Sequence, residues 1–432
     1  MSDISPRERR KKHRKTRRAE NKSRAYDERA RRRGRKSKRA IRRARKRKRR
    51  IIAAIILLLF AGMYLTFLYS DNAFISKWRT IYIETAMSTT HHKWLATMFI
   101  PHSIIDDVMK NVEEQKEAQK ELESKWEVVG NDNTDNTDST ENTDPIETFL
   151  KKYWEIDSTS VRDYLTNNSI DTQEEIDSLV ISDLSGSNGL KTAAGDKLLV
   201  VDVKNGLLII QVSGSDYVGK LAIEKDPSKV CLDKSKYLGS RGEIIDDYGE
   251  RNNAILAINA SGFRDVGGHG SGGEVKGSMV IDGTEYGSPN RSDYKFFGMT
   301  YDNKFNILNW GSVDKTQYRW GIQFFPAIVV DGECTVAGTY GLGIQPRTAI
   351  GQAKDGSFLM LIVDGRQVGY SLGTTMEECA NQLIKYGAYQ AANLDGGSSS
   401  IMWYNGQQIT KSSSPSGFGR YLPDAIYVKK AS

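Results

Sequence analysis

Histidine is scarce in this chain, with five residues among 432. Only His269 lies in the region patterned as a folded domain, so a Ser-His-Asp or Cys-His enzyme would have to use it. Zinc sites built from several histidines are excluded. The three cysteines, Cys231, Cys334 and Cys379, are far apart, form at most one disulfide and lack metal-ligand spacing. Carboxylates and arginines are therefore the reactive groups to consider.

Acidic residues are few at the start of the chain, where residues 1–50 hold 27 Lys or Arg against 5 Asp or Glu. This net charge of +22, subtracted from the total of +8, leaves about −14 for residues 51–432. A basic arm can neutralise the phosphates of nucleic acid, but this one has no aromatic interleaving beyond Tyr26 and no fold signal. We expect no nucleic-acid partner, and a topology determinant that touches anionic lipid head groups.

Charged residues are absent between Arg50 and Asp71. As a helix, residues 51–70 would span roughly 30 Å, the thickness of a bilayer core. The alternative is a cleaved signal peptide, but the preceding basic region is too long and no A-x-A site follows. We therefore expect a single-pass anchor in the cell membrane, with residues 1–50 cytoplasmic and the C-terminal part extracellular, because Lys and Arg are retained inside.

The region after the anchor divides by composition. Residues 71–127 are expected to form a juxtamembrane region and a charged stalk helix, with Ile105 and Val112 on its apolar side. Residues 128–145 contain a low-complexity polar linker. A calcium-loop interpretation of its aspartates lacks the required Gly and the closing Glu. Residues 146–190 are typical of short helices that cap or connect to the next domain.

From residue 191 the pattern changes to strands. Residues 198–212 are typical of a hairpin with an Asn-Gly turn, and Asp-Gly or Asn-Gly dipeptides recur beside apolar runs. One helix stands out, because Thr375 and Glu378 predict a capping box and Gly387 a C-terminal stop. Residues 191–432 therefore predict one α+β domain with a mixed or antiparallel sheet and a few helices.

The stretch 391–404, A-A-N-L-D-G-G-S-S-S-I-M-W-Y, predicts a strand, a tight polar turn and a second strand. Asn393 and Asp395 alternate on one face of the first strand, and flexible backbone follows at Gly396 and Gly397. Taken alone, Asp-Gly-Gly is most often only a hairpin turn.

Two further clusters precede it. Asn259 ends a buried-type strand, where an Asn often simply caps the turn through its side chain. The Gly-rich segment 267–277 contains His269 and Glu274 and could approach a ligand closely or act as a flexible lid. It is not a phosphate loop, because G-K-[ST] is missing.

Two arginines form the last cluster. Arg347 opens one strand, and Arg366 follows another strand that ends at Asp364. The planar fork of arginine suits bidentate recognition of phosphate. A solvated surface arginine is the usual explanation for either one alone.

Together, five motifs resemble the phosphodiester glycosidase family over roughly residues 190–430. In order they are I-N-A-S-G-F, R-T-A-I-G, V-D-G-R, the G-T-T-M-E-E-C-A helix and N-L-D-G-G-S-S-S. Ser398 stands where the family commonly has a third glycine, and Ala260-Ser261 replaces part of a Gly-Gly-Phe continuation. Both replacements are small for small, so we expect the backbone to be kept.

The resemblance implies cleavage between a sugar's anomeric carbon and a phosphodiester oxygen. Asp395 is then the expected principal carboxylate, as nucleophile or as base for water, with Asp364 or Glu274 as the second and His269 as a weaker candidate acid. The residues expected to hold phosphate and sugar are Arg347, Arg366, Asn259, Asn393, Gly396, Gly397, Ser398 and Ser399.

The resulting prediction is a membrane-anchored extracytoplasmic hydrolase acting on sugar-1-phosphodiester linkages in cell-wall or exopolysaccharide glycans. Its anchor and acidic stalk resemble those of Gram-positive, membrane-tethered relatives. The alternative is a non-catalytic glycan-binding or scaffold protein of exopolysaccharide biosynthesis. No cofactor is predicted, and a divalent metal requirement stays open.

Overall fold

The computed structural model describes residues 6–88, 93–126, 144–265, 270–290 and 293–431. The predicted linker, apart from its last two residues, and the candidate His269 lie outside the described residues. The chain divides into two compact units, 1–79 and 80–432.

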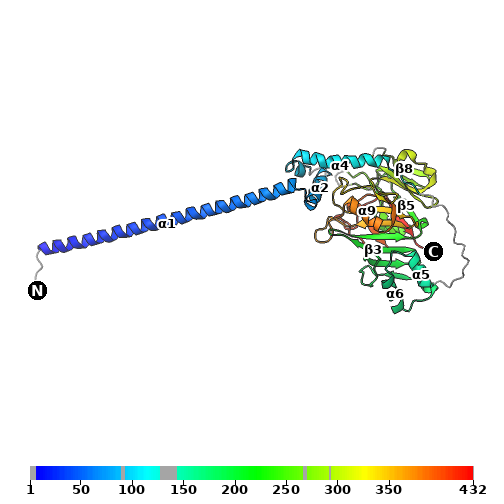
Figure 1. The fold of residues 1–432 in the computed structure, drawn as a ribbon, viewed down its shortest axis with the longest axis horizontal. Helices are drawn as coiled ribbons and strands as arrows, with labels where there is room; N and C mark the ends of the chain where they lie inside the picture. Colours follow the sequence, from blue (N-terminus) through cyan, green and yellow to red (C-terminus); the bar gives the residue numbers. More distant parts are fainter. Residues whose placement is uncertain (1–5, 89–92, 127–143, 266–269, 291–292, 432) are drawn as a thin grey trace. The chain divides into compact units, whose positions relative to one another are not determined.

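The first unit is dominated by helix α1 (Pro6–Tyr69), drawn in blue in Figure 1. By length and composition, this helix is apolar enough to cross a membrane, a property that signal sequences share. The Arg79 guanidinium donates hydrogen bonds of 2.9 to 3.1 Å to the carbonyl oxygens of Phe67, Leu68 and Ser70. Arg79 thereby satisfies carbonyls that the end of α1 leaves without a partner.

The second unit contains three sheets whose neighbouring strands are all antiparallel. The nine-stranded sheet contains, in spatial order, β1 (Val180–Ser182), β2 (Lys197–Asp202), β3 (Leu207–Ser213), β4 (Val218–Glu224), β15 (Phe358–Val363), β14 (Arg347–Ala353), β16 (Ala388–Asn393), β12 (Ala327–Val330) and β13 (Glu333–Cys334).

Two five-stranded sheets complete the strand inventory of the described residues. One contains β10 (Phe305–Leu308), β9 (Lys295–Thr300), β11 (Tyr318–Phe324), β7 (Gly277–Ile281) and β8 (Thr284–Ser288). The other contains β18 (Gln407–Gln408), β17 (Met402–Tyr404), β6 (Ala254–Asn259), β19 (Asp424–Lys429) and β5 (Val230–Lys234).

The nine-stranded sheet is buried on both faces. Along β15, Leu359 and Leu361 belong to one apolar core, whereas Met360 and Ile362 belong to another. This alternation follows from the two-residue period of a strand, and it explains why the strand reads as a continuous apolar run. The second core also contains residues of both five-stranded sheets, so the sheets share it.

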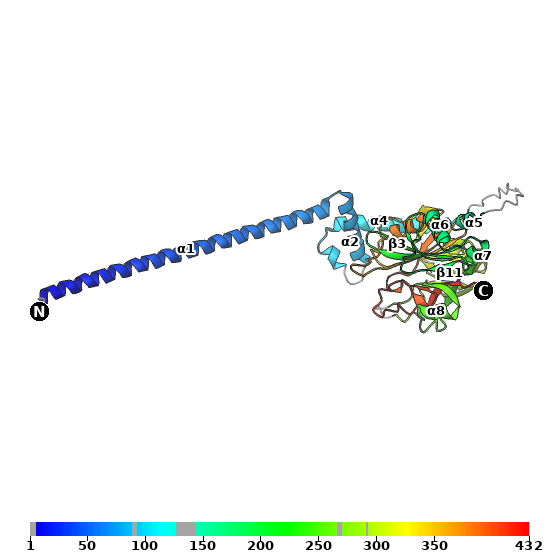
Figure 2. The same cartoon turned by 90° about the horizontal axis from the view of Figure 1, so that it is seen from below.

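Helices cover the other face of the nine-stranded sheet. They are α5 (Pro145–Lys152), α6 (Ser158–Asn167), α7 (Gln173–Asp177) and α9 (Met376–Lys385), and each contributes residues to the first core. Helix α8 (Ile245–Arg251) packs instead on β6. Figure 2 shows α5 and α6 on one side of the strands and α8 on the other. This arrangement confirms the predicted α+β class.

Helix α4 (His102–Glu121) is fastened to the sheets. The buried Gln119 amide donates to the Ala327 carbonyl at 2.9 Å and accepts from the Ala327 N–H at 3.2 Å, as a neighbouring strand would. Just beyond the helix, Ser124 exchanges two 2.8 Å hydrogen bonds with the backbone of Ile307 in β10. The predicted stalk helix is therefore part of the same compact unit as the sheets. Helices α2 (Ala73–Ser88) and α3 (Trp94–Thr97) precede it.

Two local predictions are confirmed. The hairpin of residues 198–212 appears as the antiparallel pair β2 and β3. Helix α9 begins after a complete capping box between Thr375 and Glu378, and Gly387 follows it with a φ of +84°. In both places neighbouring residues in the chain supply the defining hydrogen bonds, so local pattern sufficed.

Candidate active site

The turn 395–399 connects two different sheets. Strand β16 before it belongs to the nine-stranded sheet, whereas β17 after it pairs with β6 in a five-stranded sheet. A short 3₁₀ turn, Gly397–Ser399, lies between them. The stretch is therefore a crossover at the boundary of two sheets and not the hairpin that Asp-Gly-Gly alone would favour.

Steric and backbone constraints explain why positions 396 and 397 of the turn are glycine. A β-carbon on Gly396 would lie 2.8 Å from the Pro346 carbonyl oxygen. Gly397 has a φ of +64°, and a β-carbon there would lie 3.2 Å from Nη2 of Arg366. The Gly397 N–H donates to the Pro346 carbonyl at 2.9 Å. Close backbone contact with Pro346 thus requires glycine at position 396, and the positive φ favours glycine at position 397.

Asn259, at the end of β6, is fully buried and holds the turn in place. Its Nδ2 donates to the backbone oxygen of Asp395 at 2.6 Å. Its Oδ1 accepts from Thr348 Oγ1 at 2.9 Å and from the Ile401 N–H at 3.1 Å. The side chain therefore connects both sheets through the turn, which is a positioning role.

Asn393 ends β16 and is 3% exposed. Its Nδ2 donates to the Phe325 carbonyl at 2.8 Å, and its N–H donates to the Pro326 carbonyl at 3.0 Å. Among the described residues, its Oδ1 has no hydrogen-bond partner. Asn393 thus fastens the strand that leads to Asp395 and keeps one buried acceptor unused.

Asp395 is half-buried, and burial raises the pKa of its carboxyl to about 6. A hydrogen bond from the Ser399 side chain and the positive charges of Arg420 and Lys276 oppose this rise, whereas the negative charge of Asp265 adds to it. The carboxyl is thus poised to ionise near neutral pH, a property common at catalytic sites.

Arg420 is the cation that sequence reasoning missed. Its Nη1 donates to Ser398 Oγ at 3.2 Å and to Asp265 Oδ2 at 3.1 Å, and its guanidinium lies 5.0 Å from the centre of the Phe263 ring. Asp265 in turn accepts from the Gly270 N–H at 2.6 Å. In the sequence, this arginine follows Gly-Phe-Gly in an otherwise polar loop. No motif or spacing in the sequence connects that loop to Asp395.

Arg366 lies beside a different residue of the turn, Gly397. Its backbone φ is +59°, a conformation that costs a non-glycine residue free energy and is often found at functional sites. The exposed side chain donates to Gln345 Oε1 at 3.0 Å and lies beside Gly397. The structure therefore places Arg366 beside the turn, and its role as a phosphate ligand stays a prediction.

Arg347, by contrast, is 3% exposed. Its Nη2 donates to the Gly343 carbonyl at 2.5 Å and its Nε to the Thr374 carbonyl at 3.4 Å. Burial lowers the pKa of the guanidinium to about 10, and the nearby charge of Arg366 lowers it further. Arg347 thus connects the loop that contains Gly343 to the loop that contains Thr374 through hydrogen bonds. Its contact with phosphate stays a prediction.

Asp364 is held by a different set of groups. It is 4% exposed, and its two carboxylate oxygens accept from Tyr370 Oη and the Lys411 N–H, both at 2.9 Å. Burial raises the pKa of this carboxyl to about 6. The neighbouring Gly365 packs against Pro346, the residue that Gly396 also touches. The two Asp-Gly turns therefore meet at Pro346, but their carboxylates have separate partners.

Glu274 lies at the surface with 66% of its side chain exposed, 3.4 Å from the guanidinium of Arg264. Asp424 was missed by sequence reasoning, although it is fully buried and its charge interacts with that of Asp395. Ser261 donates to it twice, from the N–H at 2.8 Å and from Oγ at 2.5 Å. Burial raises the pKa of Asp424 to about 7.

Within the described residues, no group of three or more His, Cys, Asp or Glu side chains is arranged to hold a metal ion. The polar groups around the turn are instead two guanidiniums, two hydroxyls and a half-buried carboxyl. Such a set suits an anionic ligand that carries hydroxyl groups.

Comparison with known proteins finds a family model that matches the region of the site. Residues 252–429 match the model of the phosphodiester glycosidase family. Over 216 residues the chain is 29% identical to the SPbeta prophage-derived uncharacterized protein YomE of Bacillus subtilis (strain 168). The match covers 45% of this chain and 31% of that protein, so the chain spans about a third of the relative's length.

Two solved structures are similar at lower identity. The catalytic domain of zebrafish N-acetylglucosamine-1-phosphodiester alpha-N-acetylglucosaminidase, auto-inhibited by its pro-peptide, is 18% identical with a TM-score of 0.41, over 52% of this chain and 82% of that one. A hypothetical protein from Synechocystis is 14% identical with a TM-score of 0.39, over 55% and 65%. All the predicted site residues lie inside the range that the family model matches.

Proposed function

We propose that this chain hydrolyses glycosides whose anomeric carbon is linked to a phosphodiester, because residues 252–429 match the phosphodiester glycosidase family. The observation that supports the proposal most directly is the position of Asp395 in a turn flanked by two guanidiniums. Arg366 lies beside Gly397, and Arg420 donates to Ser398. A carboxylate next to two planar cations is the arrangement needed to handle a sugar and a phosphate together.

In the proposed reaction, the bond between the anomeric carbon and the bridging phosphate oxygen breaks. The oxygen of water joins the anomeric carbon, and the phosphate leaves as a monoester that keeps the bridging oxygen. Ionised Asp395 stabilises the oxocarbenium-like transition state, as nucleophile or as the base that activates water. Arg366 and Arg420 stabilise the charge that develops on the departing phosphate.

The contacts in the structure favour one candidate for the second catalytic carboxylate that the sequence did not suggest. Asp265 is the candidate whose charge interacts with that of Asp395 and which shares Arg420 with the turn. Asp364, Glu274 and His269 stay predictions for this role. Replacing each carboxylate singly by its amide and ranking kcat/KM would identify the one that matters.

The test uses the full-length chain in detergent micelles and the methyl phosphodiester of N-acetylglucosamine 1-phosphate as first substrate, followed by other hexoses. Release of reducing sugar and of methyl phosphate is expected from the unmodified chain and not from Asp395→Asn. If methyl alcohol and sugar 1-phosphate appear instead, a different bond is cut and the glycosidase proposal is overturned.

A second candidate function is glycan binding without hydrolysis. It is favoured by one observation: both carboxyls that interact with Asp395 are already engaged, Asp265 by Arg420 and Asp424 by Ser261. A non-hydrolysing protein would bind the same diester with measurable affinity and release no sugar over a prolonged incubation. Turnover that Asp395→Asn abolishes would show that the chain is a hydrolase and would exclude binding without hydrolysis.

We further propose that helix α1 anchors the domain in the cell membrane and that the substrate is a cell-wall or exopolysaccharide glycan of a Gram-positive envelope. The uncharged stretch of α1 after a strongly basic arm supports an anchor with its N-terminus inside. The contact of residues 1–50 with anionic lipid head groups stays a prediction. Protease added outside intact cells should remove the C-terminal domain and leave the arm protected.

A further inference from the structure

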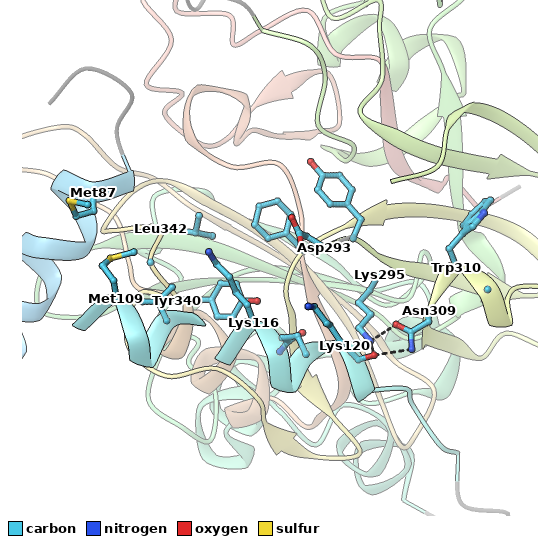
Figure 3. A pocket seen from close by; sticks show the side chains of 16 residues that line it. Met87, Met109, Lys116, Lys120, Asp293, Lys295, Asn309, Trp310, Tyr340 and Leu342 are labelled. Carbon is cyan, nitrogen blue, oxygen red and sulfur yellow. Dashed lines mark hydrogen bonds between the residues drawn. The ribbon is translucent and has the colours of Figure 1, made fainter. Parts of the chain in front are cut away.

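A cavity of about 600 Å³ lies between helix α4 and the loops of the sheets (Figure 3). Cavities of this size are typical of small-molecule sites. Helix α4 contributes Met109, Lys116 and Lys120, and the loops contribute Tyr294, Trp310 and Tyr340. Because α4 lies outside residues 252–429, the family domain by itself does not enclose this cavity.

The wall formed by α4 is held rigidly at its C-terminal end. Lys295 Nζ donates to the Lys120 carbonyl at 3.2 Å, to the Leu122 carbonyl at 2.6 Å and to Asn309 Oδ1 at 2.7 Å. Burial lowers the pKa of Lys295 to about 8. All three protons of this ammonium are engaged, two by backbone carbonyls at the end of α4 and one by Asn309, so Lys295 shapes the cavity and is not available to a ligand.

The lining has an apolar end, an aromatic end and two lysines between them. In the view of Figure 3, Met87, Met109 and Leu342 lie at one end, and Trp310 lies at the other. Lys116 and Lys120 rise from α4 between them. Lys116 and Lys120 pair with the exposed Glu113 and Glu117 of the same helix, at 3.7 and 2.5 Å, and the negative charge of the exposed Asp293, which also lines the cavity, acts on Lys120. Such surface pairs are weak, so both ammoniums can turn to a bound anion.

The cavity shares a wall with the Asp395 turn. Tyr294 lines the cavity, and the charge of Asp395 contributes to the raised pKa of its hydroxyl. Phe325 also lines the cavity, and its carbonyl accepts the hydrogen bond from Asn393, two residues before Asp395. A ligand in the cavity would therefore lie next to the turn and could extend to it.

We propose that this cavity binds a phosphate-bearing sugar unit of the glycan, adjacent to the unit whose phosphodiester is cleaved. The sugar stacks on the rings of Trp310 and Tyr294, and its phosphate accepts hydrogen bonds from Lys116 and Lys120. This inference rests on the proposed function for its substrate class. It assigns to α4 a part in selecting phosphorylated polymers over single sugar phosphates.

The experiment measures binding in the full-length Asp395→Asn chain, so that hydrolysis does not interfere. The short probe is the methyl phosphodiester of N-acetylglucosamine 1-phosphate. The long probe carries, in place of methyl, a second N-acetylglucosamine with its own phosphate monoester. Titration calorimetry at low and high salt should give tighter binding of the long probe by about tenfold, with the advantage reduced by salt.

The double variant Lys116→Ala, Lys120→Ala should abolish the advantage of the long probe. Their side chains are 44% and 50% exposed, so the variant is expected to fold. The matched control, Lys110→Ala with Lys125→Ala, removes the same charge at residues that do not line the cavity and should retain the advantage. Trp310→Ala tests stacking separately and should reduce the advantage at both salt concentrations.

The proposal is overturned if both probes bind equally, or if the two double variants lose the same affinity. Its failure is distinguishable from failure of the proposed function. A chain with Asp395 that prefers the long probe but cleaves neither retains the cavity site without being a hydrolase. A chain that cleaves both probes at equal efficiency is a hydrolase without the cavity site.

Discussion

Asp364 and Asp395 occupy similar places in the chain and meet different surroundings. Each follows a strand on one side of β14, precedes a glycine that packs against Pro346, and has its pKa raised to about 6 by burial. Both carboxylate oxygens of Asp364 accept hydrogen bonds from neutral donors, the Tyr370 hydroxyl and the Lys411 N–H. Asp395 has one hydroxyl partner, and two positive charges act on each carboxylate, Lys220 and Lys411 on Asp364 and Arg420 and Lys276 on Asp395.

The difference shows that a shifted pKa does not identify a catalytic group. Burial alone produces the same direction and size of shift in both aspartates. The two aspartates differ in how many hydrogen-bonding positions of the carboxylate are left for a ligand. Asp364 holds the loop at Lys411, and the adjacent Ser412 donates to the Ser398 carbonyl at 3.1 Å. Asp364 thus helps to position the turn that begins at Asp395.

The largest expected effect is the loss of activity in Asp395→Asn. The amide cannot ionise, so the transition state loses its carboxylate, and kcat should fall by about 10³-fold or more. Asp364→Asn should retain most of the activity, because its partners are structural. Steady-state kinetics with reducing-sugar release measures both. Equal losses in the two variants would remove the distinction between the two turns.

The arginines beside the two turns give the next effect. Arg366→Ala removes a cation from the turn and should lower kcat/KM by about 10²-fold with little change in the free energy of unfolding. Arg347→Ala leaves two buried carbonyls without a donor and should destabilise the fold by about 2 kcal/mol. Urea unfolding followed by tryptophan fluorescence separates the two outcomes. A stable Arg347→Ala chain with lost activity would instead support direct phosphate binding by Arg347.

The pH dependence separates the same two carboxyls. If Asp395 acts in its ionised form, kcat/KM should rise with pH through about 6 and level off above it. This limb should persist in Asp364→Asn. Burial raises both pKa values in the folded state above the ordinary value of an aspartate, about 3.9, so each aspartate stabilises the fold fully below about 4 and loses that contribution as pH rises through about 6.

Stability measured across that range provides the control. Asp364→Asn should lose part of the fall in unfolding free energy between about pH 4 and 6, because its amide does not titrate. An unchanged slope would mean that Asp364 is not buried as a titrating group.

The smallest expected effect concerns the glycines at Pro346. Gly396→Ala and Gly365→Ala would each place a β-carbon 2.8 Å from the Pro346 backbone and should cost about 1–3 kcal/mol of stability. Only Gly396→Ala should also lower kcat, since it displaces Asp395. Gly311→Ala, which meets no atom within 4 Å, is the matched control and should leave thermal stability near that of the unmodified chain.

Some features of the site were accessible to sequence reasoning. The motifs around Asn259, Arg366 and Asp395 indicated one family and one region, and the structure brings these three residues to the same turn. Arg420 and Asp265 escaped notice because their relation to Asp395 arises only when the segments 263–270 and 398–420 come together. No spacing in the chain encodes such a contact.

By itself, the sequence determined elements whose hydrogen bonds are local: the β2–β3 hairpin, the capped helix α9 and the uncharged C-terminal part of helix α1. It also identified the apolar run before Asn259 as a buried-type strand, and all six residues of β6 are buried. Only the tertiary structure decided that 391–404 crosses between sheets and that α4 packs on them. The physical reason is that side chains such as Asn259 and Gln119 form hydrogen bonds with partners more than a hundred residues away.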